Sequence, residues 1–268
     1  MAIQNYADLL AVVLNTPEVV KGDISSRVNC TLLTLHGNRN LKKPITTTIF
    51  KVSSHEPRTI REISTWKPLD IVRVSGFIAT EDIEKKVICP HCGTVNRRID
   101  SVAGARSGGT FVYVYPIYAH KVDSVSSKED AEKYLEENID YLNHVILIGN
   151  ITKKPVYSSP CTHFQLAINR KYCPRGQADI KERADFPWVY SYGKHAEKNY
   201  AALKQGSVVM VDGVLQSREY AEDYICSECG EGFQYRGNTL EVLSFYTDYI
   251  SNCDLDALEN IRENTEEV

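Results

Sequence analysis

The segment that decides the fold is LKQGSVVMVDGVLQSREYAEDYICSECG, residues 203–230. It aligns without a gap with WKPLDIVRVSGFIATEDIEKKVICPHCG, residues 66–93, at an offset of 137 positions (203 minus 66). Each copy holds an apolar strand pattern, a glycine (Gly76 or Gly213), a second short strand, a charged stretch and C-x-x-C-G. Self-similarity at a fixed period is the mark of repeated structural units, so the chain is predicted to contain two similar β domains in tandem.

The second half of the chain carries the clearest strand patterns. HVILIGNIT (144–152) is β-branched and apolar, and both HFQLAINRKY (163–172) and FPWVYSYG (186–193) alternate with a period of two. The glycine inside SVVMVDGVLQSREY (207–220) suggests a bulge or sharp curvature. KHAEKNYAAL (194–203) is helical by composition. Strands interrupted by one helix predict a mainly β protein built from small five-stranded barrels.

The remaining segments set the domain boundaries. We expect a first β domain over 1–125, an acidic helical linker over 126–142, a second β domain over 143–250 and an acidic tail over 251–268. In the linker, Ser127 can cap a helix whose first turn is acidic. A further helix is predicted at residues 5–14, because apolar residues recur there at helical spacing: Tyr6, Leu9, Leu10 and Val13.

Composition narrows the class of protein. The chain has 268 residues, 43% of them hydrophobic and 25% charged, as in ordinary globular proteins. No apolar run reaches the roughly 18 residues of a membrane span, and the N-terminus does not resemble a signal peptide. We therefore expect a cytoplasmic protein with no membrane partner. The net charge is −4, but Lys and Arg outnumber Asp and Glu by 16 to 11 over residues 1–125 and by 11 to 8 over 143–224. Both candidate binding domains thus allow phosphate contacts.

Three motifs in the second half carry a resemblance to a known family. NHVILIGNITKKPVY (143–157), FQLAINRKY (164–172) and ADFPWVYSYGKHAEKNYAALKQGSVVMVDGVLQSREY (184–220) resemble, in the same order, the strands and helix of bacterial single-stranded DNA-binding proteins. The resemblance covers about residues 143–220 and implies an OB fold. For the whole chain it implies two tandem OB-fold barrels with short helices and C-x-x-C hairpins.

The resemblance also implies how the site works. Aromatic side chains on such a barrel stack on unpaired bases, and nearby cations follow the phosphates. The family's stacking aromatics fall on four positions, and Trp188 and Tyr190 share a strand face with two of them, Phe186 and Tyr192, by period two. The predicted DNA-binding residues are Tyr172, Phe186, Trp188, Tyr192 and Tyr220, with the cations Arg170, Lys171, Lys194 and Arg218. Packing of these rings in the barrel core or in an oligomer interface is the competing interpretation.

The first domain departs from this pattern. The repeat places His55 opposite Tyr192 and Ile83 opposite Tyr220, so two stacking positions are not aromatic. The first barrel is therefore predicted either to be a structural partner or to use a different contact surface, formed by Tyr113, Tyr115 and Tyr118.

The two C-x-x-C-G motifs predict a metal site. Without an export signal the eight cysteines should stay reduced, and paired C-x-x-C then indicates metal binding. Zn²⁺ in structural sites takes four ligands, so each knuckle supplies half a shell. The predicted zinc ligands are Cys89, Cys92, Cys226 and Cys229, either shared in one four-thiolate site within or between chains, or completed locally by His91, Cys161, His163 or Cys173.

No phosphate-cradling loop or paired-carboxylate motif stands out, so we expect no enzymatic activity. The first hypothesis is a sequence-tolerant single-stranded DNA-binding protein that protects DNA in replication, recombination or repair and contacts other proteins of those processes. Two alternatives remain open: a protein-interaction scaffold built from OB barrels, and an RNA binder that uses the same stacking chemistry. The resemblance implies self-association, for example a dimer of two-barrel chains.

Overall fold

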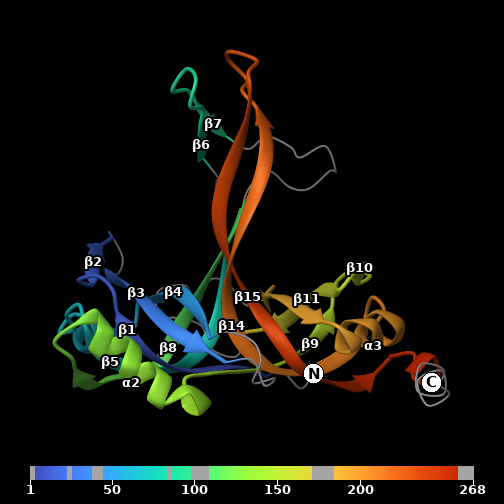
Figure 1. The fold of residues 1–268 in the computed structure, drawn as a ribbon, viewed down its shortest axis with the longest axis horizontal. Helices are drawn as coiled ribbons and strands as arrows, with labels where there is room; N and C mark the ends of the chain where they lie inside the picture. Colours follow the sequence, from blue (N-terminus) through green and yellow to red (C-terminus); the bar gives the residue numbers. More distant parts are fainter. Residues whose placement is uncertain are drawn as a thin grey trace.

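Figure 1 shows a chain made mostly of strands that wind into two barrels. The computed structural model describes residues 4–22, 26–37, 45–83, 86–97, 109–170 and 184–258. The N-terminal barrel is formed by five strands: β1 (Gln4–Val13), β3 (Ser26–His36), β4 (Thr46–Ser54), β5 (Asp70–Ile83) and β8 (Gly109–Ser124). They follow the order β1-β5-β8-β4-β3, and a β3–β1 pairing closes the circle. The short helix α1 (Pro57–Ile63) connects β4 to β5, and β2 (Glu18–Lys21) extends the edge beside β3.

The C-terminal barrel repeats this topology. Its five strands are β9 (Asn143–Ile151), β11 (Cys161–Asn169), β13 (Trp188–Tyr192), β14 (Val208–Ile225) and β15 (Gly232–Ser251). They close in the order β9-β14-β15-β13-β11 with β11 returning to β9. In both barrels the third and fifth strands run parallel, and α3 (Lys194–Ala202) takes the place that α1 has in the first barrel. This topology confirms the predicted mainly β fold with two OB barrels.

Alternating side chains fill the barrel interiors. In β9, Val145, Leu147 and Ile151 are buried, and Phe164, Leu166 and Ile168 of β11 meet them in one continuous apolar core. The residues between them face outward, as the two-residue period of a strand requires. The short strands β10 (Val156–Ser158) and β12 (Ala184–Asp185) flank β11.

The helix predicted at residues 5–14 is wrong, because this segment forms β1. Ala7, Leu9 and Ala11 point into the barrel, whereas Leu10 and Val12 pack on the other side against a second apolar cluster. In a strand that is buried on both faces, apolar residues can stand at adjacent positions, as Leu9 and Leu10 do here. Such a run can have the spacing of apolar residues on one face of a helix, which is why the segment was predicted to be helical.

The predicted linker helix is present as α2 (Lys128–Glu137). The backbone N–H of Asp130 donates to Ser127 Oγ over 3.0 Å, so Ser127 caps the helix as expected. Ala131 and Leu135 pack against Leu10 and Val12, so the helix covers the outer side of β1. A 3-10 turn (Ile139–Tyr141) then leads into β9.

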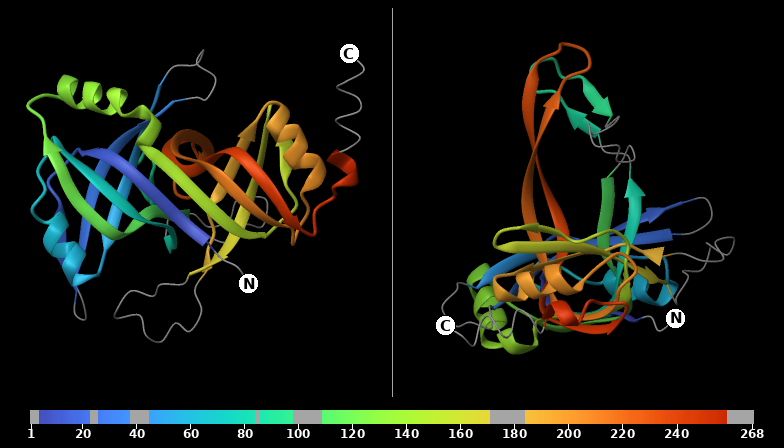
Figure 2. Two further views of the ribbon diagram at one scale, coloured as in Figure 1. Left: turned by 90° about the horizontal axis from the view of Figure 1, so that it is seen from below. Right: turned by 90° about the vertical axis from the view of Figure 1, so that its right-hand side faces the viewer.

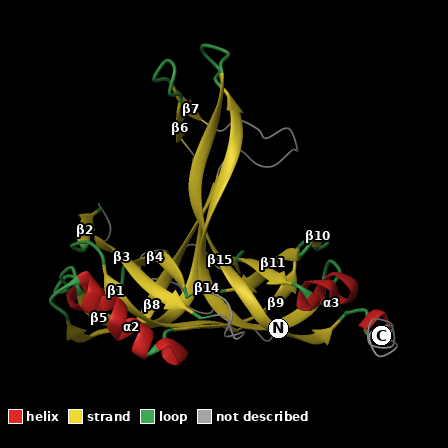
Figure 3. Cartoon of the chain, viewed as in Figure 1, coloured by secondary structure: helices red, strands yellow, loops and turns green. Residues whose placement is uncertain are grey.

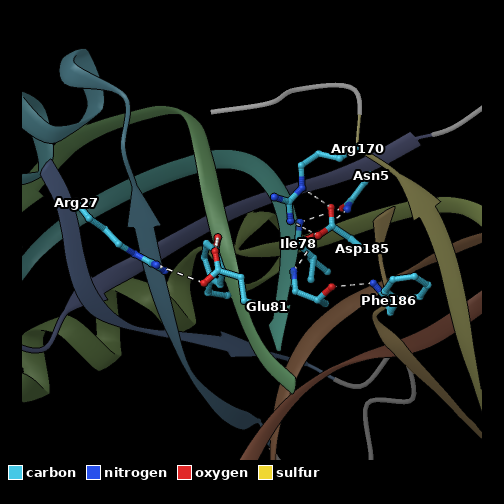
Figure 4. Close-up of polar contacts among 9 residues, drawn as sticks. Asn5, Arg27, Ile78, Glu81, Arg170, Asp185 and Phe186 are labelled. Atoms are coloured by element: carbon cyan, nitrogen blue, oxygen red, sulfur yellow. Dashed lines mark hydrogen bonds and ion pairs between the residues drawn. The ribbon is translucent and has the colours of Figure 1, made fainter. Parts of the chain in front are cut away.

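The two barrels are related by an approximate two-fold axis through the β1–β9 pairing, where Ala7 lies opposite Val145. Equivalent side chains make equivalent bonds. The side-chain amide of Asn5 donates to the backbone C=O of Ile78 and accepts a hydrogen bond from its N–H. Asn143 forms the same two bonds with Leu215. Across the junction, the N–H of Phe186 donates to Thr80 Oγ1 (Figure 4), and the N–H of Ile49 donates to Ser217 Oγ. The sequence repeat therefore reappears as a symmetric, hydrogen-bonded junction.

Two arms project from the same side of the barrels, as the right-hand view of Figure 2 shows. The C-terminal arm, residues 219–238, is the continuation of the β14–β15 ladder up to the pair Ile225 and Gly232. The N-terminal arm, residues 86–97, holds the small sheet of β6 (Lys86–Ile88) and β7 (Val95–Arg97). Figure 3 shows that the helices lie at the barrels and not at the arms. Within the described ranges, no helix has the length and apolar character needed to cross a bilayer.

Candidate nucleic-acid interface and metal centre

An aromatic face covers the outer side of β11 and β13 in the C-terminal barrel. Trp188, Tyr190 and Tyr192 alternate with buried Val189 and Ser191, so the three rings share the outward side. On the neighbouring strand, His163 lies opposite Tyr190, and the two rings stack with centroids 5.3 Å apart and planes at 17°. We call His163, Trp188, Tyr190 and Tyr192 the aromatic face. It occupies the strands by which OB folds bind oligonucleotides.

Arg218 of β14 borders this face. Its guanidinium lies 5.0 Å from the centroid of the Tyr190 ring and donates to the Tyr190 hydroxyl over 3.0 Å. Arg218 Nε also donates over 2.9 Å to Glu241, a carboxylate that is 1% exposed. These contacts hold the Tyr190 ring in place, while the Arg218 side chain stays 39% exposed, so its predicted contact with phosphates stays a prediction. Burial, and secondarily the charge of Arg218, lowers the pKa of His163 and so favours the neutral ring next to Tyr190.

The other predicted contact residues lie around the aromatic face. Phe186 precedes β13 and is 40% exposed beside the N-terminal barrel. Lys194 is an exposed residue at the start of α3, and Tyr220 lies half-buried at the base of the C-terminal arm. Lys171 and Tyr172 fall outside the described residues. All of these positions stay predictions.

The prediction that Arg170 contacts phosphates is wrong. Its side chain is 2% exposed and forms a two-point ion pair with Asp185, which has no exposure at all. Asp185 in turn accepts the backbone N–H of Thr80 from the N-terminal barrel over 2.9 Å (Figure 4). Arg170 therefore helps to join the two barrels and is closed off from solvent.

The contact surface predicted for the first barrel does not form. Tyr113 and Tyr115 are 2% and 1% exposed and pack with Phe77 in a small core. Tyr118 is exposed but lies further along β8, opposite Ser75. His55, at the position equivalent to Tyr192, follows directly after β4 and is half-buried. Among the described residues, the outer sides of β3 and β4 thus carry no aromatic counterpart to the aromatic face.

Sequence reasoning missed His163 as part of the aromatic face and considered it only as a metal ligand. Neighbouring residues of a strand point to opposite sides, so His163 faces outward where Phe164 is buried. The alternation in HFQLAIN therefore already indicated an outward-facing ring at His163. Only the pairing of β11 with β13 shows that this outward direction leads to Tyr190.

The four predicted thiol ligands meet at the tips of the two arms. The Sγ atoms of Cys89 and Cys229 are 3.8 Å apart, those of Cys92 and Cys226 are 3.6 Å apart, and all four lie within 4.8 Å of one another. Sulfurs bound at about 2.3 Å to one tetrahedral ion lie about 3.8 Å apart. The cluster is therefore compatible with a single metal ion, and the cysteines of both knuckles of one chain lie together in it.

Local backbone geometry explains why the two cysteines of each knuckle can face the same ion. In the two knuckles the N–H of Gly93 bonds to the carbonyl of Cys89, and the N–H of Gly230 to that of Cys226. Both glycines have positive φ angles, 74° and 73°, which let the chain double back. Asn96 of the N-terminal arm contacts Cys226 Sγ over 3.6 Å and accepts the Ser227 N–H over 2.9 Å. The arms are thus joined by polar contacts as well as by thiols.

The topology defines the class of this protein: it is a tandem OB-barrel protein whose second barrel carries an aromatic face on its outer side. The single-strand binding protein family model matches residues 142–224. The chain is 35% identical over 101 residues to single-stranded DNA-binding protein 2 of Streptococcus agalactiae, which covers 34% of this chain and 75% of that protein. The chain belongs to the single-strand binding protein family.

One further sequence relative and one solved structure are also similar to the chain. A single-stranded DNA-binding protein of Caldanaerobacter subterraneus is 40% identical over 84 residues, covering 30% of this chain and 54% of that protein. The chain thus spans little more than half the length of several curated relatives. The crystal structure of the single-stranded DNA-binding protein from Thermus aquaticus matches 94% of this chain and 95% of its own, with a TM-score of 0.61 and 13% identity. At that identity the match shows a common two-barrel fold.

Proposed function

We propose that the chain binds single-stranded DNA with little sequence preference on the aromatic face, and so covers exposed strands during replication, recombination or repair. The observation that carries this proposal is the row of Trp188, Tyr190 and Tyr192 on the outer side of β13, with His163 and Arg218 fixing the middle ring. Such rings stack on any base, which gives affinity without sequence selection. The relatives named as single-stranded DNA-binding proteins support the choice of ligand.

Replacement of Trp188 and Tyr190 by alanine tests this function. Each stacking ring contributes about 1–3 kcal/mol, so the double variant should bind oligo-dT roughly 100-fold more weakly. Tyr118→Ala, which removes an exposed ring from β8, is the matched control and should bind like the wild type. Oligo-U and duplex DNA are titrated in parallel at two salt concentrations. Preference for oligo-U would assign the face to RNA, and no binding to any nucleic acid would leave the protein-interaction scaffold.

We further propose that the four cysteines bind one structural Zn²⁺. Four thiolates form a closed tetrahedral shell with no position for substrate, which is the donor set of structural zinc sites. Metal analysis of the purified chain, combined with native mass measurement, is the test. One ion for each monomer supports the site, and a protein without metal that keeps its folded arms would exclude it.

Self-association is proposed through the outer side of the sheet shared by the two barrels. Tyr6 of β1 lies opposite Ile146 of β9, and Ile148 lies opposite Met210 of β14, all at least partly exposed. This apolar band lies beside the β1–β9 pairing and faces outward, so a second copy can bind it in a self-complementary way. Ile146→Glu should lower the mass measured by analytical ultracentrifugation, while a wild type that is already monomeric would remove this proposal.

A further inference from the structure

A second aromatic pair lies outside the aromatic face, at the free edge of the C-terminal barrel. Tyr157 of β10 and Tyr200 of α3 have ring centroids 5.4 Å apart with planes at 34°, and they are 36% and 42% exposed. β10 is the last strand of the sheet path, next to β11. Neither ring belongs to the buried clusters of the described chain, so core packing does not account for them.

The pair is continuous with the aromatic face through β10. Val156 lies directly opposite His163, and Ser158 lies opposite Cys161, so both continue the outward side of β11. Tyr157, the residue between them, points to the other side of β10, where α3 lies. Figure 1 places β10 and α3 at the same end of this barrel. A polymer that crosses the aromatic face towards β10 therefore reaches the tyrosine pair by passing over a single short strand.

A strand bound on the aromatic face could continue over β10 or along the C-terminal arm, and charge distinguishes these two routes. The C-terminal arm also carries rings beyond the face, among them Tyr220, Tyr224 and Tyr235. Residues 219–236, however, contain five acidic side chains and one arginine, which disfavours a phosphate backbone. The segments around the tyrosine pair, residues 152–158 and 193–206, contain five lysines and one glutamate. The basic edge at β10 and α3 is thus the favourable continuation for a polyanion.

We propose that Tyr157 and Tyr200, with Lys153 and Lys154 beside them, form a second subsite for the same DNA strand. Nucleotides that extend past the aromatic face cross β10, and a base stacks on the exposed tyrosine pair while the lysines follow the phosphates. This inference rests on the proposed function of the aromatic face. It adds a binding segment that short strands do not reach.

The test is the dependence of affinity on strand length. Wild type and the Tyr157→Ala/Tyr200→Ala double variant are titrated with oligo-dT of about 6 and about 16 nucleotides, which span the range of site sizes for one OB fold. Tyr246→Ala, which removes a 52% exposed tyrosine from β15, serves as the control, and circular dichroism checks the fold. The double variant should bind the long strand about tenfold more weakly and the short strand like the wild type.

Two results would overturn the subsite: equal affinity of variant and wild type for the long strand, or an equal loss for both lengths. Failure of the proposed function itself looks different, because the wild type would then bind neither strand. Lys153→Gln/Lys154→Gln gives an independent reading that leaves both rings in place. For the long strand it should flatten the slope of log affinity against log salt by about 1.4 units, as expected for two lost phosphate contacts at about 0.7 units each on a single strand. An unchanged slope would argue against the path over β10.

Discussion

Cys92 and Cys226 are 134 residues apart in the chain, yet their Sγ atoms approach to 3.6 Å. This contact joins the tips of two arms that arise from different barrels. The barrels themselves are joined by the β1–β9 pairing. Two-stranded ladders are marginally stable on their own, so the arms depend on what holds their tips.

If the cysteines bind zinc as proposed, its removal should loosen the arms before it affects the barrels. We expect that a chelator, or Cys89→Ser/Cys92→Ser, speeds amide hydrogen exchange over residues 219–238 by at least about tenfold. Exchange in β11 (Cys161–Asn169), inside the C-terminal barrel, should stay unchanged and serves as the internal control. Mass spectrometry of exchanged peptides measures both. Equal protection of the arm with and without metal would show that the thiolate cluster does not order it.

Stability should fall at mildly acidic pH because of His195. Burial, and secondarily the charge of Lys198, lowers the pKa of His195 from 6.5 to about 4. Its Nε2 accepts from Asn199 Nδ2 over 3.3 Å and lies 3.0 Å from Ser244 Oγ, contacts that suit the neutral ring. The unfolded chain binds this proton first, so the stability present above pH 6.5 is lost as the pH falls towards 4, by roughly 2–3 kcal/mol.

Urea unfolding of wild type and His195→Gln at a series of pH values measures this effect. The variant cannot titrate at this position, so its stability should change less between pH 7 and pH 4.5. The same slope in both proteins would place the titrating group elsewhere.

The buried pair of Arg170 and Asp185 should affect stability and not DNA affinity. Arg170→Ala leaves a fully buried carboxylate without its cation, which should cost about 3–5 kcal/mol in thermal or urea unfolding. Arg170→Met/Asp185→Asn removes both charges and keeps an oxygen for the Thr80 N–H, so it should recover most of the loss. Arg73→Ala, which breaks a half-exposed pair with Asp8, should cost about 1 kcal/mol or less.

Oligo-dT titration separates the two roles of Arg170. If a folded Arg170→Ala variant showed a flatter salt dependence of binding, Arg170 would be a phosphate contact after all. An unchanged salt dependence, together with the stability loss, is the result that the buried geometry requires.

The paired glycines of the sequence repeat should not tolerate a side chain. A Cβ on Gly213 would lie 2.1 Å from the carbonyl oxygen of Leu243, and one on Gly76 would lie 2.0 Å from that of Tyr115. We expect Gly213→Ala to lower the free energy of unfolding by about 1–3 kcal/mol, because two backbones would have to separate. Gly37→Ala meets only the Ile139 side chain at 3.5 Å and should change stability by about 0.5 kcal/mol or less. Equal stability of both variants would mean that the barrel relaxes freely around Gly213.

Local sequence patterns determined much of the fold and the chemistry of the site. The repeat that aligns Gly76 with Gly213 predicted two like barrels, and the alternation in FPWVYSYG placed Trp188, Tyr190 and Tyr192 on one side of a strand. Ser127 marked the start of α2. These features depend on neighbours within a few residues or on the repetition of one pattern, and both can be read along the chain.

Tertiary structure alone decided the features that depend on which strands meet. The pairing of β1 with both β5 and β9 made a strand of a segment with helical spacing, and the junction buried Arg170 against Asp185. The fold also brought Cys89 next to Cys229, so that all four cysteines of the two knuckles lie within 4.8 Å of one another. Burial and strand pairing depend on contacts between distant parts of the chain, such as Thr80 with Asp185, 105 positions apart, and Cys89 with Cys229, 140 positions apart. Such contacts cannot be read from patterns of neighbouring residues.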